Sequence, residues 1–117
     1  MSKVGFKIKG KEFNLDVKEL SLLGKFWGLM FSRRENARAL LFDFGKSGFW
    51  SIHSLFVFYD FIAIWIGENG KVVGVEKVKP WKFRVVPKKK VVKLIEIPCN
   101  KKYSEIVFFL DGVEKSL

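Results

Sequence analysis

The sequence predicts a mainly β protein, an antiparallel β-barrel or sandwich of about eight strands with one short helix. Short apolar runs alternate with polar residues along most of the chain, and turn-forming residues separate them. One segment, residues 20–30, spaces its apolar side chains as a helix does. The chain has 117 residues, of which 49% are hydrophobic, so we expect one domain over residues 1–117.

The first predicted element is a β-hairpin. Val4, Phe6 and Ile8 alternate with polar or small residues, and residues 13–17 alternate in the same way beyond the turn at Gly10. This period of two is typical of paired strands with one buried face.

A helix is expected next, over residues 20–30. Leu20, Leu23, Trp27 and Met30 recur at helical spacing. Two glycines inside this segment cost about 1 kcal/mol each in a helix interior, so the helix should be short.

The remaining strands are expected at residues 38–44, 51–58, 61–66, 71–79, 91–97 and 105–110. The strongest turn signal between them is Asn69-Gly70, which favours a tight hairpin between the strands on either side. Residues 81–85 lie between two prolines and alternate apolar with basic side chains, so we expect the aromatic ones in the core.

The most apolar stretch, residues 48–67, is about long enough to cross a bilayer as a helix. A carboxylate near the centre of a span costs about 2.5–3.5 kcal/mol, and Asp60 occupies that position. The stretch is also rich in Phe, Trp, Ile and Val, which suit a pleated sheet. We therefore expect buried strands and no membrane span.

The single histidine, His53, lies in the same stretch. A catalytic histidine needs a nucleophile within reach and an orienting acid, and Ser51, Ser54, Asp43 and Asp60 are near it in sequence. An enzyme centred on His53 stays open beside the simpler interpretation of a partly buried histidine bonded to backbone.

The candidate ligand-binding residues are Trp50, His53, Ser54, Asp60 and Trp81. No catalytic residue is assigned, because no nucleophile elbow, P-loop, dinucleotide fingerprint or zinc-protease motif occurs. One Cys and one His are too few for the usual zinc site, so no metal and no cofactor are predicted.

The formal net charge is +10, and residues 71–102 carry eleven Lys and Arg against two Glu. Such a field attracts polyanions. Lysine outnumbers arginine, which favours point-charge attraction over base reading and hence weak sequence specificity. The candidate polyanion-binding residues are Lys77, Lys79, Lys82, Arg84, Lys88, Lys89 and Lys90.

A family resemblance emerges from the motifs. Gly28-Leu29-Met30-Phe31, followed by Arg33, resembles the GLMFR element of the DUF192 (UPF0127) family of uncharacterised proteins. The likeness continues in order at residues 40–42, 49–54, 70–73, 79–81 and 96–98. The Ile-His pair within residues 49–54 is similar to the archaeal form of the family motif.

The resemblance covers about residues 20–100 and implies a small, mainly antiparallel β domain with one short helix. It implies no activity, because the family is uncharacterised. Two departures stand out: Ile62 occupies the position of the family's acid, and Cys99-Asn100 replaces its Ala-Gly.

The leading functional hypothesis is a non-enzymatic domain that binds a ligand or partner. The alternative is a weak, sequence-tolerant binder of nucleic acid or another polyanion. An apolar edge strand at residues 106–110 would allow pairing across a homodimer. The N-terminal residues lack the apolar core of a signal peptide, so a cytoplasmic location is expected. The absence of Gln and Thr, with abundant Lys, suggests a thermophilic source.

Overall fold

The computed structural model describes residues 2–20 and 29–116. Within them the strands are β1 (Ser2–Ile8), β2 (Lys11–Leu20), β3 (Leu40–Gly48), β4 (Phe61–Ile66), β5 (Val72–Val78) and β6 (Val91–Pro98). Two short 3₁₀ turns, η2 (Arg34–Asn36) and η3 (Lys101–Tyr103), and one helix, α1 (Ser104–Ser116), complete the described elements. The prediction of a mainly β fold with one short helix is confirmed, with six strands in the described ranges.

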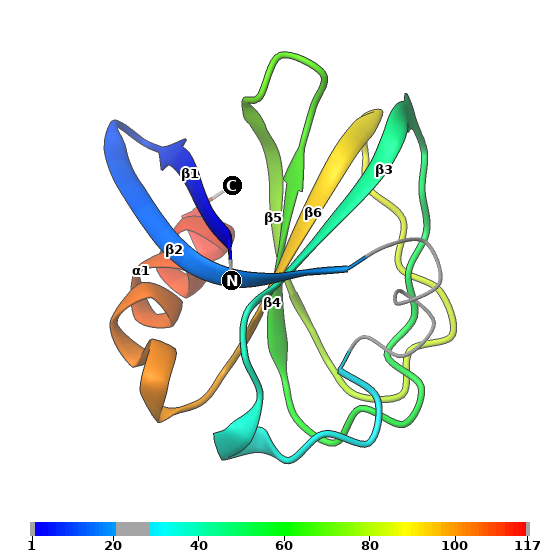
Figure 1. Ribbon diagram of the computed structural model, residues 1–117, viewed down its shortest axis with the longest axis vertical. Coiled ribbons are helices and arrows are strands. Elements are labelled where there is room, and N and C mark those ends of the chain that lie inside the picture. Colours follow the sequence, from blue (N-terminus) through cyan, green and yellow to red (C-terminus); the bar gives the residue numbers. More distant parts are fainter. Residues whose placement is uncertain (1, 21–28, 117) are drawn as a thin grey trace.

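The strands form one mixed sheet in the order β1-β2-β3-β6-β4-β5, curled into a half-barrel (Figure 1). The pairing of β2 with β3 is parallel, and every other neighbouring pair is antiparallel. The fully buried strand β4 lies between β5 and β6. Residues 61–66, the last part of the apolar stretch 48–67, therefore form an interior strand, as expected from their composition.

The predicted N-terminal hairpin is confirmed. Phe6 and Phe13 face each other across it, with ring centroids 5.3 Å apart. Its turn places Lys9 at φ 51° and Gly10 at φ 80°, the positive pair that a tight hairpin needs. Most of the helix expected at residues 20–30 lies outside the described residues; Leu20 ends β2, and residues 29–30 belong to a turn.

The expectation of a strand at residues 105–110 is wrong, because this segment forms α1. Tyr103, Leu110 and Val113 are buried at helical spacing and pack against the sheet. The amide oxygen of Asn100 accepts a hydrogen bond from the Tyr103 N–H just before the helix begins. The edge strand proposed for a homodimer is therefore not formed.

The expectation of a strand at residues 51–58 is also wrong. This segment crosses the sheet as a loop, and its one bridge to another segment in the described residues joins Ile52 to Val85. The strands expected at residues 61–66, 71–79 and 91–97 are confirmed as β4, β5 and β6, and the one expected at 38–44 as the first part of β3.

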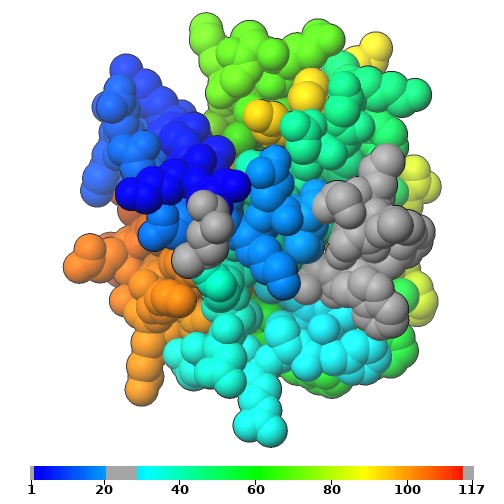
Figure 2. Space-filling model, in the orientation of Figure 1, coloured from blue at the N-terminus to red at the C-terminus, as the bar shows by residue number. Residues whose placement is uncertain are grey.

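The sheet has two differently covered faces. One, here called the helix face, packs against α1, with the β1–β2 hairpin beside it on the left of Figure 2. The other, the loop face, is covered by residues 29–37, 49–60 and 79–90. Glu114 of α1 accepts a hydrogen bond from the Lys77 N–H and so protects the edge of β5.

None of the helices in residues 2–20 and 29–116 is both long and apolar enough to span a bilayer.

Candidate nucleic-acid interface

Ser54 fixes the loops of the loop face to one another. Its hydroxyl donates to the Lys79 carbonyl at 2.6 Å and accepts from the Lys82 N–H at 2.7 Å. Its backbone N–H donates to the Lys82 carbonyl, and its carbonyl accepts from the Trp81 N–H at 2.8 Å. Ser54 is fully buried. This candidate ligand-binding residue therefore anchors residues 79–82 from beneath the protein surface.

Trp81 lies on the surface at the centre of an aromatic patch, defined here as Phe31, Phe56, Phe58 and Trp81. The Phe56 ring centroid lies 4.9 Å from that of Trp81 and 5.0 Å from that of Phe31. Phe58 meets Trp81 edge-on at 5.8 Å. The exposed fractions are 60% for Phe31 and Phe58, 48% for Trp81 and 39% for Phe56. The patch is therefore a cluster of touching rings open to solvent.

The expectation that the aromatic residues of 81–85 are core is wrong for Trp81 and Phe83. Phe83 is 84% exposed, and only Val85 of the three alternating apolar residues is buried. Residues 79–90 do not join the sheet, so strand alternation does not decide which side chains point inward.

Three residues of the patch have an unusual backbone. Phe31 and Phe56 have φ 60°, and Trp81 has φ 64°. A bulky residue in this left-handed region costs about 1–3 kcal/mol and persists only where its surroundings hold it. The Phe31 N–H donates to the Phe56 carbonyl at 2.9 Å, and the Trp81 N–H is held by Ser54. Lys9, in the hairpin turn, is the other such residue in the described ranges.

The patch adjoins a basic strap, defined here as residues 79–90. The strap leaves the lower end of β5 and rises to the upper end of β6 (Figure 1). Its basic side chains are all exposed: Lys79, Lys82, Arg84, Lys88, Lys89 and Lys90. It contains no acidic residue. Trp81 and six of the seven candidate polyanion-binding residues therefore belong to one exposed segment that runs along the sheet from its lower to its upper end.

Trp50 and His53 make contacts with residues outside the patch. Trp50 stacks on Phe44 at 5.1 Å and donates its indole N–H to the Lys46 carbonyl at 2.8 Å. The Nδ1 atom of His53 accepts from the Leu55 N–H at 3.1 Å. Among the described residues no hydroxyl or carboxylate bonds to His53, so no nucleophile and acid are arranged around it.

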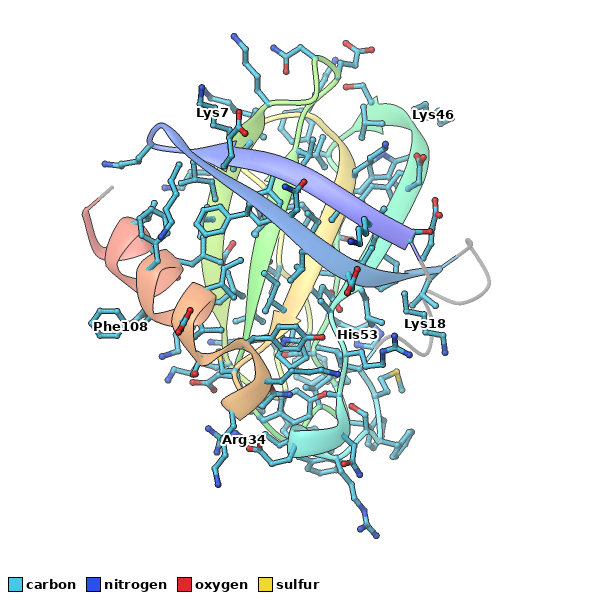
Figure 3. The ribbon with its side chains drawn as sticks, turned by 60° about the vertical axis from the view of Figure 1, so that its left-hand side comes forward. Lys7, Lys18, Arg34, Lys46, His53 and Phe108 are labelled. Carbon is cyan, nitrogen blue, oxygen red and sulfur yellow. The ribbon has the colours of Figure 1, made fainter. Side chains whose placement is uncertain are left out.

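Asp60 lies in a cleft of about 730 Å³ beside Phe58 and the start of α1. Its Oδ2 atom is 3.2 Å from Nζ of Lys79 and 3.9 Å from Nζ of Lys77. Lys77 also reaches Asp111 of α1 at 3.8 Å. Arg34, at the rim near the start of α1 (Figure 3), donates to the Cys99 carbonyl at 2.8 Å. Both aspartates of this cleft are thus paired with lysines.

A carboxyl group is buried under the loop face. Glu96 of β6 pairs in register with Leu40 and Ala63 and is 5% exposed. Burial raises the pKa of the Glu96 carboxyl to about 8. Burial also raises the pKa of Tyr59, and the nearby Glu96 charge adds to this, while the hydrogen bond with Ser32 opposes it.

The sequence-based search did not single out Phe31, Phe56 and Phe58. No local pattern separates Phe56 and Phe58 from Val57 and Tyr59, because all four are apolar or aromatic, and only the structure shows that the latter pair is buried. The described residues contain no group of three or more His, Cys, Asp or Glu side chains able to hold a metal ion.

The fold and the loop face define a small mainly β domain with an exposed aromatic and basic surface. The chain belongs to the DUF192 family (Uncharacterized ACR, COG1430), whose profile matches residues 6–102. It is 30% identical over 91 residues to the UPF0127 protein PF1050 of Pyrococcus furiosus, covering 77% of this chain and 78% of that protein. The family resemblance seen in the motifs is therefore confirmed.

Two solved structures share the fold. One, from Sinorhizobium meliloti and described as a "putative transcription regulator", has a TM-score of 0.71 at 19% identity, over 87% of this chain and 81% of that chain. The other, a protein of unknown function from Novosphingobium aromaticivorans, has a TM-score of 0.72 at 11% identity, over 88% and 76% of the two chains. At these identities the likeness concerns the fold alone.

Proposed function

We propose that this protein binds single-stranded nucleic acid, with little sequence preference, on the aromatic patch and the basic strap. The observation that carries the proposal is the placement of four exposed, touching rings beside a segment with six cations and no acid. Aromatic platforms next to a positive track are the usual means of holding an unpaired strand.

The rings supply the contact with the bases. A base stacked on an aromatic side chain contributes about 1–3 kcal/mol, and every base has a face that can stack. The fixed backbone of Phe31, Phe56 and Trp81 lowers the cost of ordering the rings on binding. Retention of three bulky residues in a costly conformation at one exposed place favours a functional role over a packing role.

The strap supplies the contact with the phosphates, chiefly through the cations other than Lys79, which is ion-paired with Asp60. Five of its six cations are lysines, which act as point charges and do not distinguish bases. Counterion release makes such binding weaken as salt rises, by about tenfold or more between roughly 50 and 200 mM.

The first test measures fluorescence anisotropy of a labelled oligothymidine of about twelve nucleotides, within the site sizes typical of such folds. The Trp81→Ala protein is expected to bind about tenfold more weakly than the unmodified protein. The matched control is Phe108→Ala, because Phe108 is 83% exposed and points away from α1 into solvent (Figure 3). Equal weakening by both substitutions, or by neither, would contradict a role for the patch.

A second comparison tests the strap. Lys82→Glu reverses one charge beside Trp81, and Lys3→Glu makes the same change at an exposed position of β1. We expect Lys82→Glu to weaken binding strongly at low salt and to reduce the salt dependence, whereas Lys3→Glu should do much less. Identical losses would indicate attraction to net charge alone.

The cleft at Asp60 is the competing site for a small ligand. We rank it second because Asp60, Lys77 and Asp111 already compensate one another. Failure of the unmodified protein to bind either single-stranded DNA or RNA at low salt would leave this cleft as the better candidate.

A further inference from the structure

A smaller pocket opens where the far end of the strap meets the edge of the sheet. Its volume is about 420 Å³. The residues that define its chemistry come from the sheet, the strap and α1: Trp65, Gly74, Glu76, Lys88, Lys89 and Glu114. Two strap lysines line it, so it adjoins the segment assigned above to the phosphates.

The indole of Trp65 lines this pocket, and its N–H makes no complete hydrogen bond. Trp65 is 2% exposed, and its Nε1–H has no hydrogen-bond partner within residues 2–20 and 29–116. Gly74 is its partner in register, and a Cβ at Gly74 would come 3.3 Å from Trp65 Cδ1. Glycine therefore leaves room for the ring. A buried N–H without a complete hydrogen bond is unfavourable, and an incoming acceptor would remove that cost.

The carboxyl group of Glu76 lies near the same indole. Burial raises the pKa of this carboxyl, and the charge of Glu114 adds to that effect. The Trp65 indole N–H, which points to this carboxyl without reaching full hydrogen-bond geometry, and the Lys88 charge both oppose the rise in pKa. The pocket thus holds a donor and an acceptor that lie close together without a complete hydrogen bond between them.

We propose that this pocket receives one base of the bound strand, whose edge accepts from the Trp65 N–H and donates to the Glu76 carboxylate. The inference rests on the proposed function and adds a second type of contact to it. Each nucleobase carries a donor beside an acceptor on its pairing edge, so the pairing suits a base without selecting one. Lys88 and Lys89 would contact the phosphates on either side.

The test compares oligothymidine with the same oligomer methylated at N3 of every base. Methylation keeps the charge and the stacking face but removes the ring N–H donor. We expect the methylated strand to bind about tenfold more weakly, since one paired base contact is worth about that factor. Glu76→Leu removes the acceptor and should weaken oligothymidine binding by a similar factor and reduce the difference between the two strands. Glu68→Leu, an equal charge change in the exposed β4–β5 turn, should preserve both the affinity and the difference.

The indole ¹⁵N–¹H resonance of Trp65, assigned with Trp65→Phe, provides an independent readout. It should shift with oligothymidine and shift much less with the methylated strand. Equal affinity for the two strands together with an unmoved Trp65 resonance would overturn the pocket while leaving the proposed function intact. Absence of binding to both strands would overturn the proposed function itself.

Discussion

The two faces of the sheet are covered by different means. On the helix face, one regular element buries Leu110 and Val113 over the strands. On the loop face, irregular segments cover the core and hold exposed rings, a buried carboxyl and left-handed backbone above it. Regular packing on one side provides stability, and the other side carries the features that cost stability. This contrast is why we assign binding to the loop face.

The largest expected effect concerns the buried carboxyl of the loop face. Because the pKa of Glu96 is raised to about 8 in the folded protein, its stabilising effect is complete below the unfolded pKa of about 4.5. As pH rises from there to about 8, the unfolded chain loses a proton that the folded chain keeps. The free energy of unfolding should therefore fall by about 1.4 kcal/mol per pH unit.

Glu96→Gln removes this titrating carboxyl, so the free energy of unfolding should fall much less as pH rises. Urea unfolding between about pH 5 and pH 8 measures it, with exposed Glu12→Gln as the control. Parallel pH profiles for the unmodified and Glu96→Gln proteins would show that Glu96 ionises normally.

The helix face should respond to the loss of a core side chain in the usual way. Leu110→Ala removes a fully buried side chain and should cost about 3 kcal/mol of unfolding free energy. Phe108→Ala, on the outer side of α1, should change it by less than about 0.5 kcal/mol. Chemical denaturation of both variants gives the comparison. Similar costs for the two substitutions would contradict the packing of the Leu110 side of α1 against the sheet.

Ser54→Ala tests how the loop face is held. The substitution leaves the Lys82 N–H and the Lys79 carbonyl without their hydroxyl partner, at a cost of about 2 kcal/mol. Amide hydrogen exchange at Lys82 should become faster, while exchange within β4 should change less. Unaltered exchange at Lys82 would show that the hydroxyl does not fix the strap.

The smallest expected effect has the opposite sign. Trp81→Gly removes a bulky residue from φ 64°, and glycine adopts that conformation freely. Unfolding free energy should stay the same or rise by about 1 kcal/mol, while affinity for single-stranded DNA falls. Loss of both stability and binding would mean that Trp81 serves packing.

Much of the sheet could be predicted from the sequence. The hairpin around Gly10 and the buried strand Phe61–Ile66 follow from local alternation and apolar runs, which tertiary packing reinforces. The helix α1 could not be recognised from residues 105–110 alone. The helical spacing of its buried side chains appears only when Tyr103 and Val113 are included, and Gly112 interrupts the apolar pattern between Leu110 and Val113.

The site was only partly predictable. The basic strap is visible as a charge run, and Trp81 was chosen as a candidate. Its exposure could not be foreseen, because the alternation of apolar and basic side chains between Pro80 and Pro87 predicts a buried aromatic face, whereas the strap follows a path set by Ser54. Phe31 joins the patch through a backbone contact with Phe56, a partner distant in sequence that no local pattern reveals.

The most direct measurement is a ¹⁵N–¹H amide titration of the protein with oligothymidine at low salt. Assigned amide resonances of residues 79–90 and of the aromatic patch should shift in proportion to the strand bound, and those of α1 and the β1–β2 hairpin should stay in place. Shifts confined to α1 and the hairpin, or no shift anywhere, would contradict the assignment of nucleic-acid binding to the loop face.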